Sequence, residues 1–217
     1  MLGRINYSGL QQELESSVKT TLNTILLCLC VPTLPSLSAI PNYEPSADHP
    51  FGQANPAAPK QILDYQHLIG LSDCESETRN PDGDWKDPVR MTWRFKYIMN
   101  GMAIQDETLK NDGAHSGSIR QYSEDLSSWF VHYYSTGSVP NSKSTSTQLS
   151  TWKGGLKDGS IVLYRKQKSP TGAEGYFRLT FSNITPEHFN WIGEWVDKEE
   201  KIAFPTWRIA CTQRGRR

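Results

Sequence analysis

The chain has 217 residues, a length typical of one domain with or without a tail. Its 23 basic and 23 acidic residues cancel, which argues against a general nucleic-acid binder and against a polybasic membrane-surface protein, because both need an excess of positive charge. Apolar residues make up only 36% of the chain, but 7 Trp, 9 Tyr and 7 Phe supply enough buried area for a packed core.

Residues 18–39 contain the three parts of a secretory signal. Lys19 is the basic residue, residues 22–31 are apolar, and small residues follow at 36–39. The apolar run is too short to span a bilayer, which takes roughly 20 residues. The residues before it are partly acidic, so we expect the true start at Val18, and we expect a periplasmic or secreted protein. The alternative is a buried apolar segment of a cytosolic protein.

Residues 40–60 contain five prolines among small and polar residues. Proline at this density prevents helices and sheet ladders, so the pattern predicts a linker. We therefore expect three parts, an N-terminal extension with signal peptide (1–39), the Pro-rich linker (40–60) and a barrel domain (61–217).

A short helix is expected directly after the linker. Its apolar positions recur at helical spacing, and Gly70 is expected to end it in the left-handed region. The residues on the shared face are Ile62, Tyr65, Gln66 and Ile69.

The rest of the chain alternates between apolar and polar residues, the pattern of strands with one buried face. In residues 90–97 four large apolar side chains alternate with polar ones, and Asn100 and Gly101 then form the favoured two-residue hairpin turn. Further strands are expected near residues 70–78, 102–109, 118–122, 129–134, 147–153, 160–166, 175–182, 188–196 and 205–212. Roughly ten short strands with little helix favour a closed antiparallel barrel without exposed edges. A two-sheet sandwich is the alternative.

The segments at residues 93–106, 118–122 and 180–191, together with Trp129, resemble an uncharacterised bacterial family of calycin type. The resemblance covers about residues 66–212. It implies an all-β fold, an antiparallel up-and-down lipocalin-like (calycin) barrel of about 8–10 strands with a short N-terminal helix. That family has no generally assigned activity, so the resemblance implies no catalytic residues.

Two cysteines lie beyond the signal, Cys74 in the first expected strand and Cys211 in the last. These strands are neighbours in an up-and-down barrel, and an exported protein permits a disulfide between them. The alternative is two unrelated buried thiols.

Motifs of enzyme chemistry do not occur in the sequence. It lacks a Gly-x-Ser-x-Gly elbow, a P-loop and a dinucleotide-binding glycine pattern. Its five histidines are not at zinc-site spacing. Residues 80–84 begin like a calcium loop, but Trp85 stands where the glycine of the sharp turn belongs, so we expect a simple turn. We predict no catalytic residue, metal or cofactor.

Polar residues inside the aromatic strands are the candidates for a binding site. An arginine that faces a barrel interior is costly unless it is paired, and therefore marks an anion or carboxylate site. The candidate ligand-binding residues are Trp93, Arg120, Tyr122, His132, Arg178 and Trp191. The arginines, His132 and the tryptophans each have a simpler explanation: the arginines are solvated on the outer face, His132 is a hydrogen-bonded core residue, and the tryptophans are packing. Arg120, Asp106 and Glu194 can equally form a structural ion pair.

The fold, the export signal and the missing motifs together favour a barrel that binds a small apolar or amphipathic molecule in its cavity. One alternative is an enzyme that uses the same cavity, with His132 or a carboxylate as general base. The other is a structural module with a filled barrel. We expect no nucleic-acid partner and no membrane span, and the sequence leaves the oligomeric state open.

Overall fold

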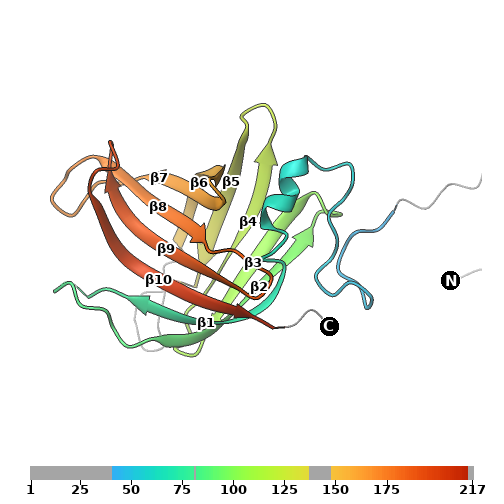
Figure 1. The fold of residues 1–217 in the computed structure, drawn as a ribbon, viewed down its shortest axis with the longest axis horizontal. Helices are drawn as coiled ribbons and strands as arrows, with labels where there is room; N and C mark the ends of the chain where they lie inside the picture. The colour runs from blue at the N-terminus through green and yellow to red at the C-terminus, as the bar shows by residue number, and fades with distance from the viewer. Residues whose placement is uncertain (1–40, 81, 137–147, 215–217) are drawn as a thin grey trace, which may run out of the picture. The chain divides into compact units, whose positions relative to one another are not determined.

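The computed structural model describes residues 41–80, 82–136 and 148–214. These residues form a short 3-10 helix and ten antiparallel strands that close into a barrel, in which each strand pairs with the next along the chain and β1 pairs with β10 (Figure 1). The elements are η1 Lys60–Tyr65, β1 Gly70–Thr78, β2 Val89–Ile98, β3 Ala103–Lys110, β4 His115–Ser123, β5 Ser128–Ser135, β6 Gln148–Lys157, β7 Ser160–Lys166, β8 Gly175–Ser182, β9 His188–Asp197 and β10 Ala203–Gln213. The prediction of an all-β up-and-down barrel with little helix is confirmed, and the sandwich alternative is wrong.

The expected strands agree with the observed ones to within a few residues. β7 and β8 have the predicted bounds, whereas β4 starts three residues earlier than expected, at His115. The turn at Asn100 and Gly101 is also confirmed. Both residues have positive φ, 53° and 77°, and the N–H of Met102 donates to the carbonyl of Met99 at 3.2 Å. Asparagine and glycine tolerate this left-handed backbone, which matches the twist of the two strands.

A disulfide joins the first strand to the last. Cys74 and Cys211 are register partners in β1 and β10, and they are bonded, with their Cα atoms 4.1 Å apart. The open question of a disulfide or two free thiols is therefore settled in favour of the disulfide. Disulfides persist in oxidising environments, so this bond is consistent with a compartment outside the cytoplasm.

Helix η1 closes one end of the barrel with apolar side chains. It ends at Tyr65, earlier than expected, and Gly70 is the first residue of β1 instead of the helix terminus. Three residues per turn place Ile62 and Tyr65 on one face of η1. Leu68 follows in the turn after the helix, and all three side chains are at most 3% exposed. Three members of the predicted face, Ile62, Tyr65 and Ile69, are therefore buried as expected, whereas Gln66 is exposed.

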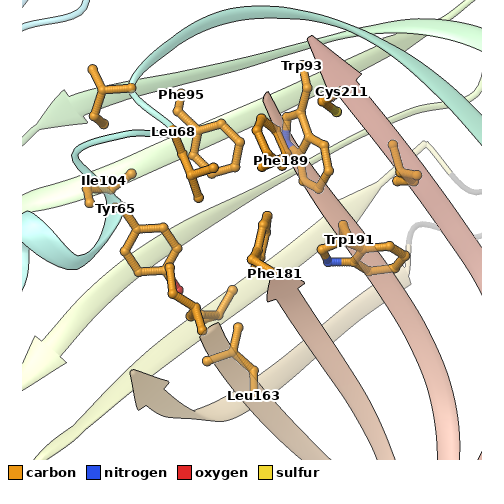
Figure 2. Close-up of a cluster of buried hydrophobic side chains, with 14 of the residues drawn as sticks. Tyr65, Leu68, Trp93, Phe95, Ile104, Leu163, Phe181, Phe189, Trp191 and Cys211 are labelled. Carbon is orange, nitrogen blue, oxygen red and sulfur yellow. The ribbon is translucent and has the colours of Figure 1, made fainter. Parts of the chain in front are cut away.

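The half of the interior beneath η1 is filled by this helix and by aromatic rings from the strands, and we call it the filled half. Its core members are Tyr65, Leu68, Phe95, Phe181 and Phe189, all of them 0% exposed (Figure 2). Their rings meet edge-on or tilted, with centroids about 6 Å apart, a favourable arrangement for aromatic pairs.

The described part of the expected linker is residues 41–60, of which Lys60 already belongs to η1; the segment before it contacts β2 and the β2–β3 turn. Asn55 donates its backbone N–H to Gly101, and Tyr97 donates to Phe51. Asn100 accepts the N–H of Tyr43 at its side chain, at 2.8 Å. The expected signal peptide lies outside the described residues. No described helix has the length and apolar character needed to cross a bilayer.

Candidate functional site

A cavity of about 230 Å³ occupies the half of the barrel interior away from η1, which we call the hollow half. Because successive residues of a strand face opposite sides of the sheet, its lining comes from alternate positions of most strands. Four tryptophans contribute to the wall, with smaller polar side chains between them. The tryptophans are Trp93, Trp152, Trp191 and Trp207. Tyr133 and Arg165 also line the cavity and are only partly buried, so the cavity reaches solvent.

Gly193 in β9 allows two of these rings to lie close to the backbone. A Cβ atom at this position would lie 2.8 Å from the ring of Trp191 and 3.1 Å from that of Phe177. These separations are shorter than ordinary van der Waals contact, so a side chain here would displace the rings into the cavity. The glycine therefore helps to keep the space open.

An ion pair between Asp106 and Arg120 forms the floor of the cavity. The Nη1 of Arg120 lies 3.0 Å from Asp106 Oδ1, and both side chains are 4% exposed. Trp93 donates its indole N–H to Asp106 Oδ2 at 2.8 Å. Ser118 donates its hydroxyl to the same carboxylate and accepts from Arg120 at 2.8 Å. The carboxylate is thus fully engaged by three neighbours.

The guanidinium of Arg120 also lies among the rings of the filled half. Its central carbon is 5.2 Å from the ring centroids of Tyr65 and Phe95 and 5.6 Å from that of Phe181. Such contacts are favourable for a desolvated cation. Burial raises the pKa of the Tyr65 hydroxyl, so this group stays neutral beside the pair. The ion pair therefore joins the two halves of the interior.

A second arginine, Arg165 of β7, lines the cavity nearer to solvent. It donates from Nη1 to the hydroxyl of Ser150 at 2.6 Å and from Nη2 to Gln167 Oε1. Its guanidinium carbon lies 4.4 Å from the ring centroid of Trp152 and 5.8 Å from that of Phe177. Burial lowers the pKa of Arg165, because partial desolvation disfavours the charged form.

Three of the six sequence-predicted site residues line the cavity. Trp93 and Arg120 belong to its floor, and Trp191 belongs to its wall. Trp191 packs edge-on against Trp207 with ring centroids 5.0 Å apart, and Trp207 donates its indole N–H to Ser76 at 2.8 Å. The sequence analysis considered Asp106 and Glu194 as ion-pair partners of Arg120, and the pair with Asp106 is present.

The other three predicted residues do not line this cavity. Tyr122 packs against Trp129 and borders an open groove of about 610 Å³ at the η1 end. His132 is exposed on the outer face, with its ring nitrogen 3.4 Å from the hydroxyl of Thr151, so the interpretation as a core histidine is wrong. Arg178 lies on the outer face, where it forms ion pairs with Glu194 and Glu200. Burial acts to lower the pKa of Arg178, but the two ion pairs outweigh it, so the pKa is raised.

Sequence reasoning missed most of the other lining residues, including Trp152 and Trp207 and above all Arg165. Residues 160–166 are apolar on both faces, so alternation alone does not reveal which face is inside. Arg165 shares a strand face with Leu163 and Ile161, which the structure shows to be 0% exposed, but Val162 and Tyr164 make the other face equally apolar in the sequence.

No protein-family model matches the chain, and no curated protein matches it significantly. The barrel architecture thus comes from the structure alone, and the calycin resemblance stays a prediction.

Among the described residues, no group of three or more His, Cys, Asp or Glu side chains is placed to hold a metal ion. At the expected turn after β1, Gly83 donates its N–H to the carbonyl of Asn80 at 3.0 Å.

Proposed function

We propose that this protein is a lipocalin-like barrel that binds a small, partly apolar molecule in the cavity of its hollow half. The observation that carries the proposal is the contrast within one interior: rings fill one half, while the other half keeps about 230 Å³ of space. This volume lies below the roughly 300–1,000 Å³ of pockets for drug-sized ligands. The cavity therefore fits a small metabolite better than a long-chain lipid.

The lining supports binding better than catalysis. Asp106 is the only carboxylate that lines the cavity among the described residues, and its oxygens already accept from Trp93 and Ser118 and contact Arg120. A general base must be free to take a proton from the substrate. The mixed wall of indole rings and hydroxyl groups is instead typical of sites that orient a bound molecule.

We also propose that the protein works in the periplasm or outside the cell. Two independent observations support this location. The disulfide between Cys74 and Cys211 is typical of oxidising compartments, and residues 18–39 have the composition of a secretory signal.

Native mass spectrometry of the chain purified from its own host, followed by denaturing extraction, tests the binding function. We expect a stoichiometric small molecule that leaves on denaturation. Val131→Phe places a ring into the cavity, since Val131 lines it and is 2% exposed, and we expect this variant to lose the molecule.

Val162→Phe is the matched control, because Val162 borders the outer groove. We expect this variant to keep the molecule. Thermal denaturation checks that both variants fold. A ligand-free wild type, or equal occupancy in the two folded variants, would contradict the proposal.

A further inference from the structure

Arg165 presents a positive charge to the cavity without a negative partner. The deeper Arg120 is neutralised by Asp106, and the outer Arg178 pairs with two glutamates. No carboxylate of the described residues lies within ion-pair distance of Arg165, and its side-chain partners, Ser150 and Gln167, are neutral. The cavity therefore carries an unneutralised positive charge.

In the part of the chain that the structure describes, only neutral groups offset the burial of this charge, namely the hydrogen-bond acceptors Ser150 and Gln167 and the ring of Trp152. Partial burial removes water from the guanidinium and lowers its pKa, and a desolvated charge is unfavourable unless a counterion restores the lost hydration. A guanidinium has five N–H donors. The two observed side-chain hydrogen bonds use one donor on Nη1 and one on Nη2. Donors remain for a ligand.

A second unsatisfied donor lies on the same wall. Trp152 is only 6% exposed. Its indole nitrogen is buried and has no hydrogen-bond partner. Buried indole N–H groups usually find an acceptor. The guanidinium of Arg165 lies 4.4 Å from the centroid of this same ring, so the two donor-bearing side chains are neighbours in the cavity wall.

We infer that the molecule bound in the cavity is a small monocarboxylic acid, with its carboxylate on Arg165 and its apolar body against the rings of the hollow half. The inference rests on the proposed binding function and names the class of its ligand. A carboxylate matches the planar donor fork of arginine. One unpaired cation balances one negative charge, so a singly charged acid fits better than a phosphate dianion.

The body of the ligand is limited by the walls on either side of Arg165. Phe177 and Leu179 line one side and Trp191 another, and below them the floor is closed by the Asp106–Arg120 ion pair. The volume of the cavity, about 230 Å³, suits a single ring or a short alkyl chain. Phenylacetate and hexanoate are probes of this size.

The test compares each acid with its uncharged amide of the same shape. We would titrate phenylacetate against phenylacetamide, and hexanoate against hexanamide, into the full chain and follow tryptophan fluorescence and calorimetric heat. A charged hydrogen bond in a partly buried site discriminates by roughly tenfold to a hundredfold. We expect each acid to bind more tightly than its amide by this factor.

Arg165→Met keeps an unbranched apolar side chain in place of the aliphatic part of arginine and removes the charge, so we expect the acid preference to vanish. Arg165→Lys should keep part of it. The matched control is Arg94→Met, since Arg94 lies on the outer face and pairs with Glu107. This variant should bind like the wild type.

The outcomes separate the two proposals. Equal binding of acid and amide, or an unchanged acid preference in Arg165→Met, would overturn the carboxylate site and leave the binding cavity standing. Tighter binding of phenyl phosphate than of phenylacetate would overturn the choice of a singly charged acid. If neither acids nor amides bind at millimolar concentration, both the ligand class and the proposed function fail.

Discussion

The two halves of the barrel interior are built by the same strands but are filled differently. Phe181 and Phe177 show this most clearly, since both belong to β8, face inward and lie four residues apart. Phe181 is 0% exposed and is surrounded by other rings, whereas Phe177 lines the cavity and remains partly exposed. The strands thus create the interior, and helix η1 determines which half is filled.

The boundary between the halves is polar. Asp106 and Arg120 are held there by Ser118 and Trp93, with rings on one side and the cavity on the other. A buried ion pair rarely adds stability over an apolar pair of the same size. Its position here serves to keep the hollow half polar at its base.

The largest effect is expected from the disulfide, which acts on both halves alike. By chain-entropy reasoning, closing a loop of 137 residues contributes about 4–5 kcal/mol to the free energy of unfolding. Replacing Cys74 and Cys211 together with Ala should lower stability by up to this amount in urea denaturation. The variant should retain the ligand if it stays folded, and a loss below about 1 kcal/mol would show that barrel closure does not depend on the bond.

The second prediction contrasts the halves directly. Phe181→Ala should cost about 3–5 kcal/mol, because it leaves a void among packed rings. Phe177→Ala should cost about 1–2 kcal/mol, because its ring is already partly in contact with solvent. Urea denaturation of the two variants measures the difference. Equal losses would mean that the hollow half is packed as tightly as the filled half.

The third prediction concerns the boundary. Arg120→Met leaves the carboxylate of Asp106 buried without its cation, which should cost about 3 kcal/mol. Arg94→Met breaks the ion pair with Glu107 on the outer face and should cost less than about 1 kcal/mol. Chemical denaturation of both variants checks the prediction, and a larger loss in Arg94→Met would contradict it.

The smallest effect is expected at the η1 end. Burial raises the pKa of Asp64 above its ordinary value of 3.8, although the hydrogen bond from Trp129 works against this shift. The folded state therefore binds a proton more tightly than the unfolded state, so this group lowers stability as pH rises above 3.8. Asp64→Asn cannot ionise and keeps an acceptor for Trp129.

We expect Asp64→Asn to be at least as stable as the wild type at pH 7, with the gain shrinking as pH falls toward 3.8. Thermal denaturation across pH measures this profile. Asp125→Asn, an exposed change in the β4–β5 turn, is the control. A gain that grows toward low pH would contradict the sign.

Most of the strands could be predicted because period-two alternation and turn residues are local signals. Residues 90–97 and the turn at Asn100 and Gly101 illustrate this, since their pattern required no knowledge of the rest of the chain. The helix was predicted less well. Its end at Tyr65 was missed because Leu68 and Ile69, which continue the apolar pattern, are buried in the turn and loop after the helix.

The candidate site was predicted less completely than the fold. Alternation separates the two faces of a strand but does not say which face is inside, and the arginines of β4 and β8 show the consequence. Arg120 faces the interior, whereas Arg178 faces outward with Glu194 and Glu200. Which charges are paired depends on side chains brought together by several strands, and no single segment contains that information.

The seam between β1 and β10 also bears on how the protein folds. Every other pair of neighbouring strands is joined directly along the chain, so nine hairpins can form through short-range contacts. The seam instead requires residues 137 positions apart to meet, and such a contact is entropically slow. The barrel should therefore assemble as a curling sheet whose two edge strands meet last, and during that interval these edges are exposed to pairing with another chain.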